Sequence, residues 1–272
     1  SIDHPEMPKI DLKYQDLQGL NFEYINLSNS DFRRANFDTA KISNVNFARA
    51  NLSYTDLSGK DLTGTILTGA NLSNTTLTGV DLSGKDLTGT KLAGVDLSGM
   101  DLTGTNLVGA DLSGMDLTGT IFTGADLSGV NLANAILVNA NLENATLEGA
   151  KLLDADLDSA NLTNANLREA LLVDAKLSNA IFIGADLSGA ILTGAILTGA
   201  DLENAVLTNT ILNCVFHPIC TPTGAELSGK DLAGTNLVGA DMSGMNLTGT
   251  ILTGADLSNS ILTSSDLSGK DL

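Results

Sequence analysis

The sequence of 272 residues has few aromatic, proline, histidine and cysteine residues. It contains no Trp, three Tyr, seven Phe, four Pro, two His and two Cys. A compact globular domain of this length would normally use more aromatic mass in its core. No run of about 18 apolar residues is present, so we expect no membrane insertion. No leader segment is recognisable, but the chain starts at Ser1, so export is neither shown nor excluded.

Positive charge is also scarce, and the net charge of −18 is unevenly distributed. Residues 1–50 contain six basic and seven acidic side chains, whereas residues 51–272 contain eight basic and 25 acidic ones, a net −17. Nucleic acids and anionic membranes bind proteins through basic residues that neutralise phosphates. The composition therefore argues against direct nucleic acid binding and favours a protein partner, a basic one in particular.

What the sequence does contain is a repeat of five residues. Every fifth residue from Leu12 to Leu272 is Leu, Phe, Ile or Met, except His217 and Pro222. The position two residues before this central residue is mostly small, and the position directly before it is mostly Asp or Asn. Neither a helix, with 3.6 residues per turn, nor a flat strand, with a period of two, maintains such a pattern.

A short extended segment followed by a turn does fit the period of five. The small and the central residue then point inward, and the residues on either side of the central one point outward. The fifth position, which holds all 28 glycines and several asparagines, becomes the turn, since these residues tolerate positive φ. The pattern predicts a β-solenoid in which leucines stack on leucines.

Segments such as "ANLSN", "ADLSG" and "ANLEN" strongly resemble the pentapeptide-repeat family, whose consensus is A-[DN]-L-x-x. The resemblance covers nearly the whole chain. It implies an all-β fold, a right-handed quadrilateral β-helix (solenoid) of about 13 coils with four pentapeptides per coil. We expect a lead-in or cap at 1–11, repeats over 12–212, an interrupting loop at 213–224 and continued repeats over 225–272.

Two features suggest binding chemistry but follow from the repeat. Gly79, Gly84 and Lys85 approach a phosphate-binding loop, yet Asp86 replaces the required Ser or Thr, and no helix is expected to follow. Lys60, Lys85, Met100 and similar residues take the small inward position; we expect the lysines to be solvated by carbonyls or to reach an edge. We expect no cofactor, no metal site and no catalytic residues.

Aspartates form columns if equivalent residues four repeats apart stack. Asp61, Asp81 and Asp101 would lie on one face, and Asp96 and Asp116 on another, where like charges repel. Cation binding would relieve this repulsion, but intervening Asn and Ile residues break the columns. We favour aspartates that are solvated and hydrogen-bonded to nearby backbone.

One outward column turns apolar. Leu171, Ile191 and Ile211 follow each other at steps of four repeats, then Asp231 and Ile251. Contiguous exposed apolar surface usually marks a contact site, so these residues predict an interaction stripe for docking or dimerisation. If the loop extrudes two repeats, Ile251 leaves this alignment.

The repeat lapses at "NCVFHPICTPTG", residues 213–224. Proline removes an amide donor, so this segment is expected to protrude as a loop that presents Phe216, His217 and Pro218. Cys214 and Cys220 are candidates for a disulfide, for free thiols, or for a metal site with His217. A disulfide would favour an oxidising, extracytoplasmic compartment; otherwise localisation is open.

The sequence shows no activated nucleophile or metal set, so we expect a non-enzymatic scaffold whose acidic rod contacts proteins. One branch of the family implies an alternative, a DNA mimic that binds DNA gyrase; its members typically dimerise through a C-terminal helix, which is not visible here. The chain stops in mid-repeat at "SGKDL", so end-to-end assembly into a filament or another homo-oligomer is a third alternative.

Overall fold

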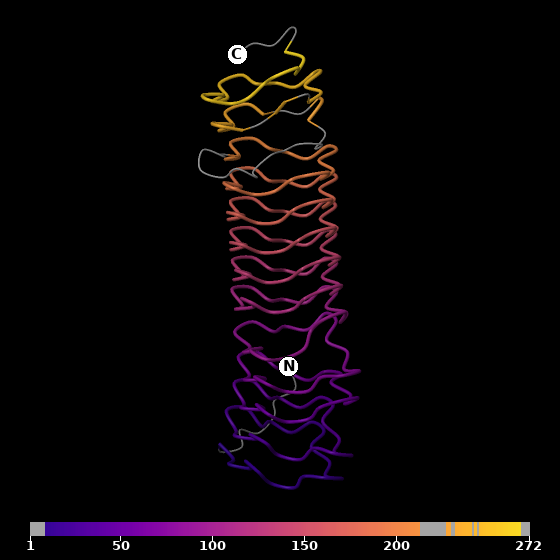
Figure 1. Ribbon diagram of the computed structural model, residues 1–272. Helices are drawn as coiled ribbons and strands as arrows, with labels where there is room; N and C mark the ends of the chain where they lie inside the picture. Colours follow the sequence, from indigo (N-terminus) through magenta and orange to yellow (C-terminus); the bar gives the residue numbers. More distant parts are fainter. Residues whose placement is uncertain (1–8, 213–226, 230–231, 241, 244, 268–272) are drawn as a thin grey trace.

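The computed structural model describes residues 9–212, 227–229, 232–240, 242–243 and 245–267. Successive coils stack into a rod (Figure 1). In the described residues no helix and no strand of several residues occurs; isolated parallel bridges join equivalent positions of consecutive coils, such as Asn141 to Asn161 and Asn161 to Ile181. Four series of such bridges run along the rod. The fold is therefore an all-β solenoid.

Residues 161–165 show how five successive residues satisfy their backbone N–H groups. Their inter-coil and turn bonds are Asn161 N to Ala140 O (2.9 Å), Leu162 N to Ile181 O (2.7 Å), Asn164 N to Ile183 O (2.8 Å) and Ala165 N to Leu162 O (3.0 Å). The remaining amide, of Thr163, donates to the Asn161 side chain at 3.1 Å. Each of the five N–H groups thus has a partner, as a stacked backbone requires.

The turn residue has a left-handed backbone, as its sequence predicts. Asn164 has φ of 56° and Gly189 has φ of 70°. Together with the hydrogen bond from Ala165 N to Leu162 O, the positive φ at the third turn residue is typical of a type II turn. Gly and Asn accept this conformation at least cost, which explains their fixed place in the repeat.

The core is a single column of central and inward side chains. Leu162, Leu167 and the alanines beside them are fully buried, which confirms the predicted inward phase. Near the N-terminus phenylalanines replace leucines, and the ring centroids of Phe32 and Phe47 lie 5.5 Å apart. No helix among the described residues is long and apolar enough to cross a membrane.

The stacking offset changes once, across the segment 213–226. Ile211 pairs with Asn236, one repeat further along the chain than the regular spacing would give, and the regular spacing then returns from Asn236 to Asp256. In the regular part of the rod, Thr90 Oγ1 donates to Leu67 O, 23 residues back. Across the segment 213–226, by contrast, Thr235 Oγ1 donates to Leu207 O, 28 residues back. One repeat, rather than two, is therefore in excess between the two parts of the rod.

The predicted loop itself lies outside the described residues. This holds for the two cysteines and for the residues expected to protrude, namely Cys214, Phe216, His217, Pro218 and Cys220. It also holds for residues 1–8 of the predicted lead-in.

Candidate interaction surfaces

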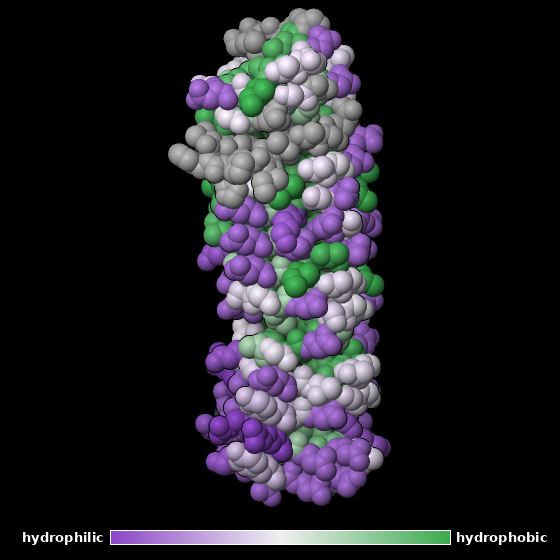
Figure 2. Space-filling model, in the orientation of Figure 1, coloured by the Kyte–Doolittle hydropathy of each residue, from purple (hydrophilic) through white to green (hydrophobic). Residues whose placement is uncertain are grey.

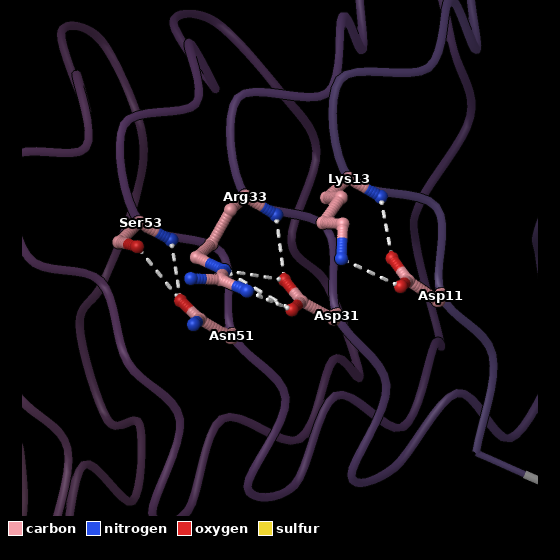
Figure 3. Close-up of polar contacts among 6 residues, drawn as sticks. All are labelled: Asp11, Lys13, Asp31, Arg33, Asn51 and Ser53. Carbon is pink, nitrogen blue, oxygen red and sulfur yellow. Dashed lines mark hydrogen bonds and ion pairs between the residues drawn. The ribbon is translucent and has the colours of Figure 1, made fainter.

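The outward Asp or Asn caps the turn that follows it. Its Oδ1 accepts a hydrogen bond from the N–H two residues later, the one amide that has no backbone partner. Figure 3 shows this arrangement in three successive coils, where Asp11, Asp31 and Asn51 accept from residues 13, 33 and 53 at 3.3, 3.1 and 3.2 Å. Asp and Asn are favoured because they supply this acceptor.

The aspartate columns are held by the same bonds. The pKa of Asp61, Asp81 and Asp101 is lowered by hydrogen bonds from the residue two positions later, most by its hydroxyl and next by its N–H group. Nearby charges have a smaller effect than these bonds and than desolvation. The neighbouring Asp81 charge opposes this lowering at Asp101. The three side chains are exposed and carry negative charge at neutral pH. This supports the interpretation that the aspartates are hydrogen-bonded to nearby backbone.

Inward polar residues donate to carbonyls of the coil below. Thr90 Oγ1 bonds Leu67 O at 3.0 Å and Thr120 Oγ1 bonds Leu97 O at 2.9 Å. Lys85 Nζ bonds Leu62 O at 2.8 Å, again 23 residues back. The expectation that a carbonyl solvates the inward ammonium is therefore confirmed at Lys85, while Lys230 lies outside the described residues.

Long inward side chains coincide with breaks in the inter-coil ladder. Between Leu12 and Leu192, in the continuously described part of the chain, eight central residues lack the usual N–H bond to the next coil: Phe37, Ile42, Leu62, Leu67, Leu77, Leu82, Leu92 and Leu97. These eight residues form four pairs, and each pair stands on either side of one inward position. The residue above that inward position, in the next coil, is Lys60, Lys85, Met100 or Met115. We call each such gap an open seam.

Three surface clefts lie at these seams. One of about 400 Å³ separates residues 74–79 from 94–100 and is lined by Met100. One of about 300 Å³ lies between residues 39–43 and 59–61, beside Lys60, and one of about 380 Å³ between 89–93 and 109–111. The long inward residues are visible in the sequence, whereas the seams were not predicted from it.

The predicted stripe is in part a real column. Parallel bridges join Leu171 to Ile191 and Ile191 to Ile211, and all three side chains are half-buried. We call these three residues the apolar column. Including Ile251 was wrong, because the extra repeat places Asn236 above Ile211 and aligns Ile251 with Val206.

Leu171, Ile191 and Ile211 also lack the cap. A hydrocarbon side chain offers no acceptor, so the N–H groups of Val173 and Thr193 receive no bond from the outward side chain. On the visible face, Figure 2 shows the most hydrophilic side chains towards the N-terminal end and more hydrophobic ones further up the rod. The column thus gives up this structural bond on three successive coils.

A second set of residues was not predicted from the sequence. Tyr14, Arg34 and Tyr54 occupy the same turn of three successive coils, and the Arg34 guanidinium lies 5.0 Å from the Tyr54 ring centroid. Their recurrence at the turn position of every fourth repeat is the signal that would have revealed them.

Comparison with known proteins gives a consistent picture. The family model described as pentapeptide repeats matches repeated copies within residues 16–215 and 223–272. HetL, a pentapeptide repeat protein involved in heterocyst differentiation regulation from the cyanobacterium Nostoc sp. strain PCC 7120, is 31% identical, covering 85% of this chain and 90% of that one, with a TM-score of 0.47. No curated protein matches the chain.

Two further solved structures are similar. A pentapeptide repeat protein from the Arabidopsis thaliana thylakoid lumen is 32% identical over 37% of this chain and 66% of that one, with a TM-score of 0.31. QnrB1, a plasmid-mediated fluoroquinolone resistance protein, is 19% identical over 81% of this chain and 93% of that one, with a TM-score of 0.27.

Proposed function

We propose that this chain, which belongs to the pentapeptide-repeat family, is a non-enzymatic scaffold whose acidic rod presents a contact surface to another protein. We further propose that the rod is right-handed and four-sided, with about 13 coils over its length. The regular offset between bridged residues and the four bridge series support four repeats per coil.

The observation that carries the proposal is the apolar column. Asp or Asn at these positions would cap the following turn, as at Asn161, where Oδ1 accepts from Thr163 N at 3.1 Å. Apolar side chains on three consecutive coils forgo this bond and leave a continuous hydrophobic strip. Such strips are typical of protein contact sites.

The test uses the double variant Ile191→Asp with Ile211→Asp. Asp is the residue that the repeat itself uses there, so the fold should persist while the strip becomes charged. The matched control is Ile66→Asp with Ile121→Asp, two outward isoleucines whose bridged neighbours are polar. If the partner is a second copy of the chain, we expect sedimentation velocity to show weaker self-association for the first variant only. Equal association of both variants and wild type would contradict a role of the apolar column in self-assembly.

Gyrase binding by DNA mimicry is a second candidate, favoured by the exposed column of Asp61, Asp81 and Asp101. A row of exposed negative charges of this kind resembles a phosphate backbone. The test is a supercoiling assay with purified gyrase, with Asp81→Asn as the variant that retains the cap. Neither inhibition nor quinolone protection at micromolar protein would count against this candidate.

A further inference from the structure

Four series of outward residues define the sides of the rod. The members of a series lie on consecutive coils, as Asn51 and Asn71 do. The chain passes the four series in turn, so neighbouring series lie on adjacent sides of a coil, and series 4 adjoins series 1 of the next coil. We number the series 1 to 4 in chain order; their first bridged members are Asp11, Asp16, Asn21 and Asn26.

Each open seam in the continuously described residues 9–212 is confined to two neighbouring series. At the seam below Met100, the N–H groups of Leu77 and Leu82 form no bond to the next coil, and series 2 and 3 have no bridge there. Series 1 and 4 keep their bridges between the same two coils, the first of them at Asn71. The two coils are therefore bonded along one side and separated along the opposite side.

The four seams do not cancel around the rod. The seams below Lys60 and Met100 both open series 2 and 3. The seam below Lys85 opens series 3 and 4, and the seam below Met115 opens series 1 and 2. These last two openings lie on opposite sides and offset each other. The net opening is therefore on the side that series 2 and 3 share.

Like charges face each other across three of the seams. On series 3, Asp81 stands between Asp61 and Asp101, and neither step carries a bridge. On series 2, the step from Asp96 to Asp116 also lacks its bridge. All five side chains are exposed, and none forms an ion pair with a cation of the described residues. Carboxylates on consecutive coils repel each other.

A fourth pair of stacked aspartates keeps its bridge. Asp11 and Asp31 are joined although their charges are alike. Each carboxylate has its own cation: Lys13 Nζ lies 2.9 Å from Asp11 Oδ2, and Arg33 Nη2 lies 2.7 Å from Asp31 Oδ2. The neutralised pair thus coincides with a closed ladder, and the three pairs without cations coincide with open ones.

We propose that residues 51–130 form a hinge whose open side is held apart by repulsion between these aspartates. The bonded series are the pivot between two coils. The long inward side chain determines where a seam lies, and the charges across the seam determine how far it opens. Screening of the charges lets the open side close around a flexible methionine. At low ionic strength the rod is therefore bent towards the side of series 4 and 1, and added salt straightens it.

The hinge changes the direction of the rod and leaves the apolar column intact. The bridges from Asp126 to Ile211 are unbroken, so the column lies in a part of the rod that the hinge does not deform. Bending instead sets the direction in which the N-terminal coils point relative to the column. The hinge therefore does not depend on the identity of the partner.

Residue-resolved hydrogen exchange, measured by NMR at about 0.01 M and about 1 M sodium chloride, tests the role of charge. The N–H groups of Leu77 and Leu82 should exchange at least about twofold more slowly at the higher concentration, because salt screens most of the repulsion within one charge pair. The seam below Lys60 is the internal control. There Asp61 faces Lys41, an opposite charge, so salt should not slow exchange.

Asp81→Asn should have the same effect without added salt. Asn keeps the cap but removes one charge from both pairs of series 3, so exchange at Leu82 should slow about threefold at about 0.01 M salt. The matched control is Asp126→Asn, whose bridged neighbours Asn106 and Thr146 are uncharged; it should match wild type. Unchanged exchange in Asp81→Asn, or equal slowing by salt at the control seam, would overturn the role of charge.

Distances between spin labels test the bend itself, in a protein whose two native cysteines are replaced by serine. One label pair takes the places of Ser58 and Ser178, next to series 2, and the other those of Thr68 and Ser188, next to series 4. Both pairs span the same number of coils, for which regular stacking gives about 29 Å. At low salt the first distance should exceed the second, and salt should shorten the first one more. Equal distances at low salt would show that the rod has no hinge.

Discussion

Residues 125–212 and residues 56–120 follow the same period but stack differently. In residues 125–212 the inward position is alanine up to Ala205, except at Val130, and the ladder of bridges from Asp126 to Ile211 is unbroken. In residues 56–120 the inward position also holds Thr, Val, Lys and Met, and three of the four open seams lie between coils of that region.

The difference indicates that the inward residue controls the spacing between coils. Hydrogen-bonded strands lie about 4.8 Å apart, and alanine or threonine fits beside the leucine of the next coil at that distance. Lys and Met are longer. Below Lys60, Lys85, Met100 and Met115, N–H groups of the lower coil form no bond to the carbonyls of the next coil; below Met100 these are the N–H groups of Leu77, Gly79 and Leu82. A packed interior cannot absorb such volume without moving the backbone.

Acidification should produce the largest difference in stability between the two regions. Hydrogen bonds from Ser and Thr hydroxyls, then from backbone N–H groups, lower the pKa of eight aspartates in residues 56–116: Asp56, Asp61, Asp81, Asp86, Asp96, Asp101, Asp111 and Asp116. Because these pKa values lie below the unfolded value of 3.8, their stabilisation is complete well above pH 4 and is lost as pH falls through the folded pKa values.

In residues 125–212 half of the eight caps are asparagines, which do not titrate: Asn131, Asn141, Asn161 and Asn166 stand beside Asp126, Asp156, Asp186 and Asp201. Hydrogen exchange read by mass spectrometry should therefore show that residues 56–116 lose protection at a higher pH than residues 125–212. Simultaneous loss of protection in both regions would show that the aspartate caps do not decide acid stability.

Adding a long inward side chain to the continuous region should create a seam there. Ala165→Met should lower the free energy of unfolding by about 1–3 kcal/mol through overpacking. By the rule seen at Met100, the amides of Leu142, Asn144 and Leu147 should exchange faster. Ala165→Thr is the control, since inward threonine is tolerated at Thr105 and Thr120, which are fully buried.

The reverse change should close a seam. Met100→Thr should restore the bonds from Leu77, Gly79 and Leu82 to the next coil and raise the free energy of unfolding by about 1 kcal/mol, the net of new hydrogen bonds and lost methionine contacts. Amide exchange at these three residues should slow. Fast exchange that persists in the variant would mean that Met100 is not the cause of the seam.

Supplying a missing cap should have the smallest effect. Ile136 is 42% exposed, and the N–H of Val138 has no acceptor on it. Ile136→Asn should raise the free energy of unfolding by about 0.5–1 kcal/mol by adding one hydrogen bond. Ile136→Val, which adds no acceptor, is the control in a urea titration, and an equal gain in both variants would disprove the capping explanation.

Much of the fold could be predicted from the repeat, because inward phase and positive φ are local consequences of residue type. The buried Leu162, the turn at Asn164 and the carbonyl partner of Lys85 all match prediction. The position of Ile251 was wrong, since an offset across the interrupting segment depends on how much of the chain leaves the stack. The row of Tyr14, Arg34 and Tyr54 was not predicted, because these residues belong to three different coils and are far apart in the sequence.

The sequence by itself determined the period, the inward side of each repeat and the place of every turn, since these depend on five adjacent residues and their backbone preferences. Only the tertiary structure decided which residues lie above one another, where the ladder opens and which side chains form columns. These properties depend on contacts between coils, and such contacts are set by side-chain volume and hydrogen bonding between residues that are distant in the sequence.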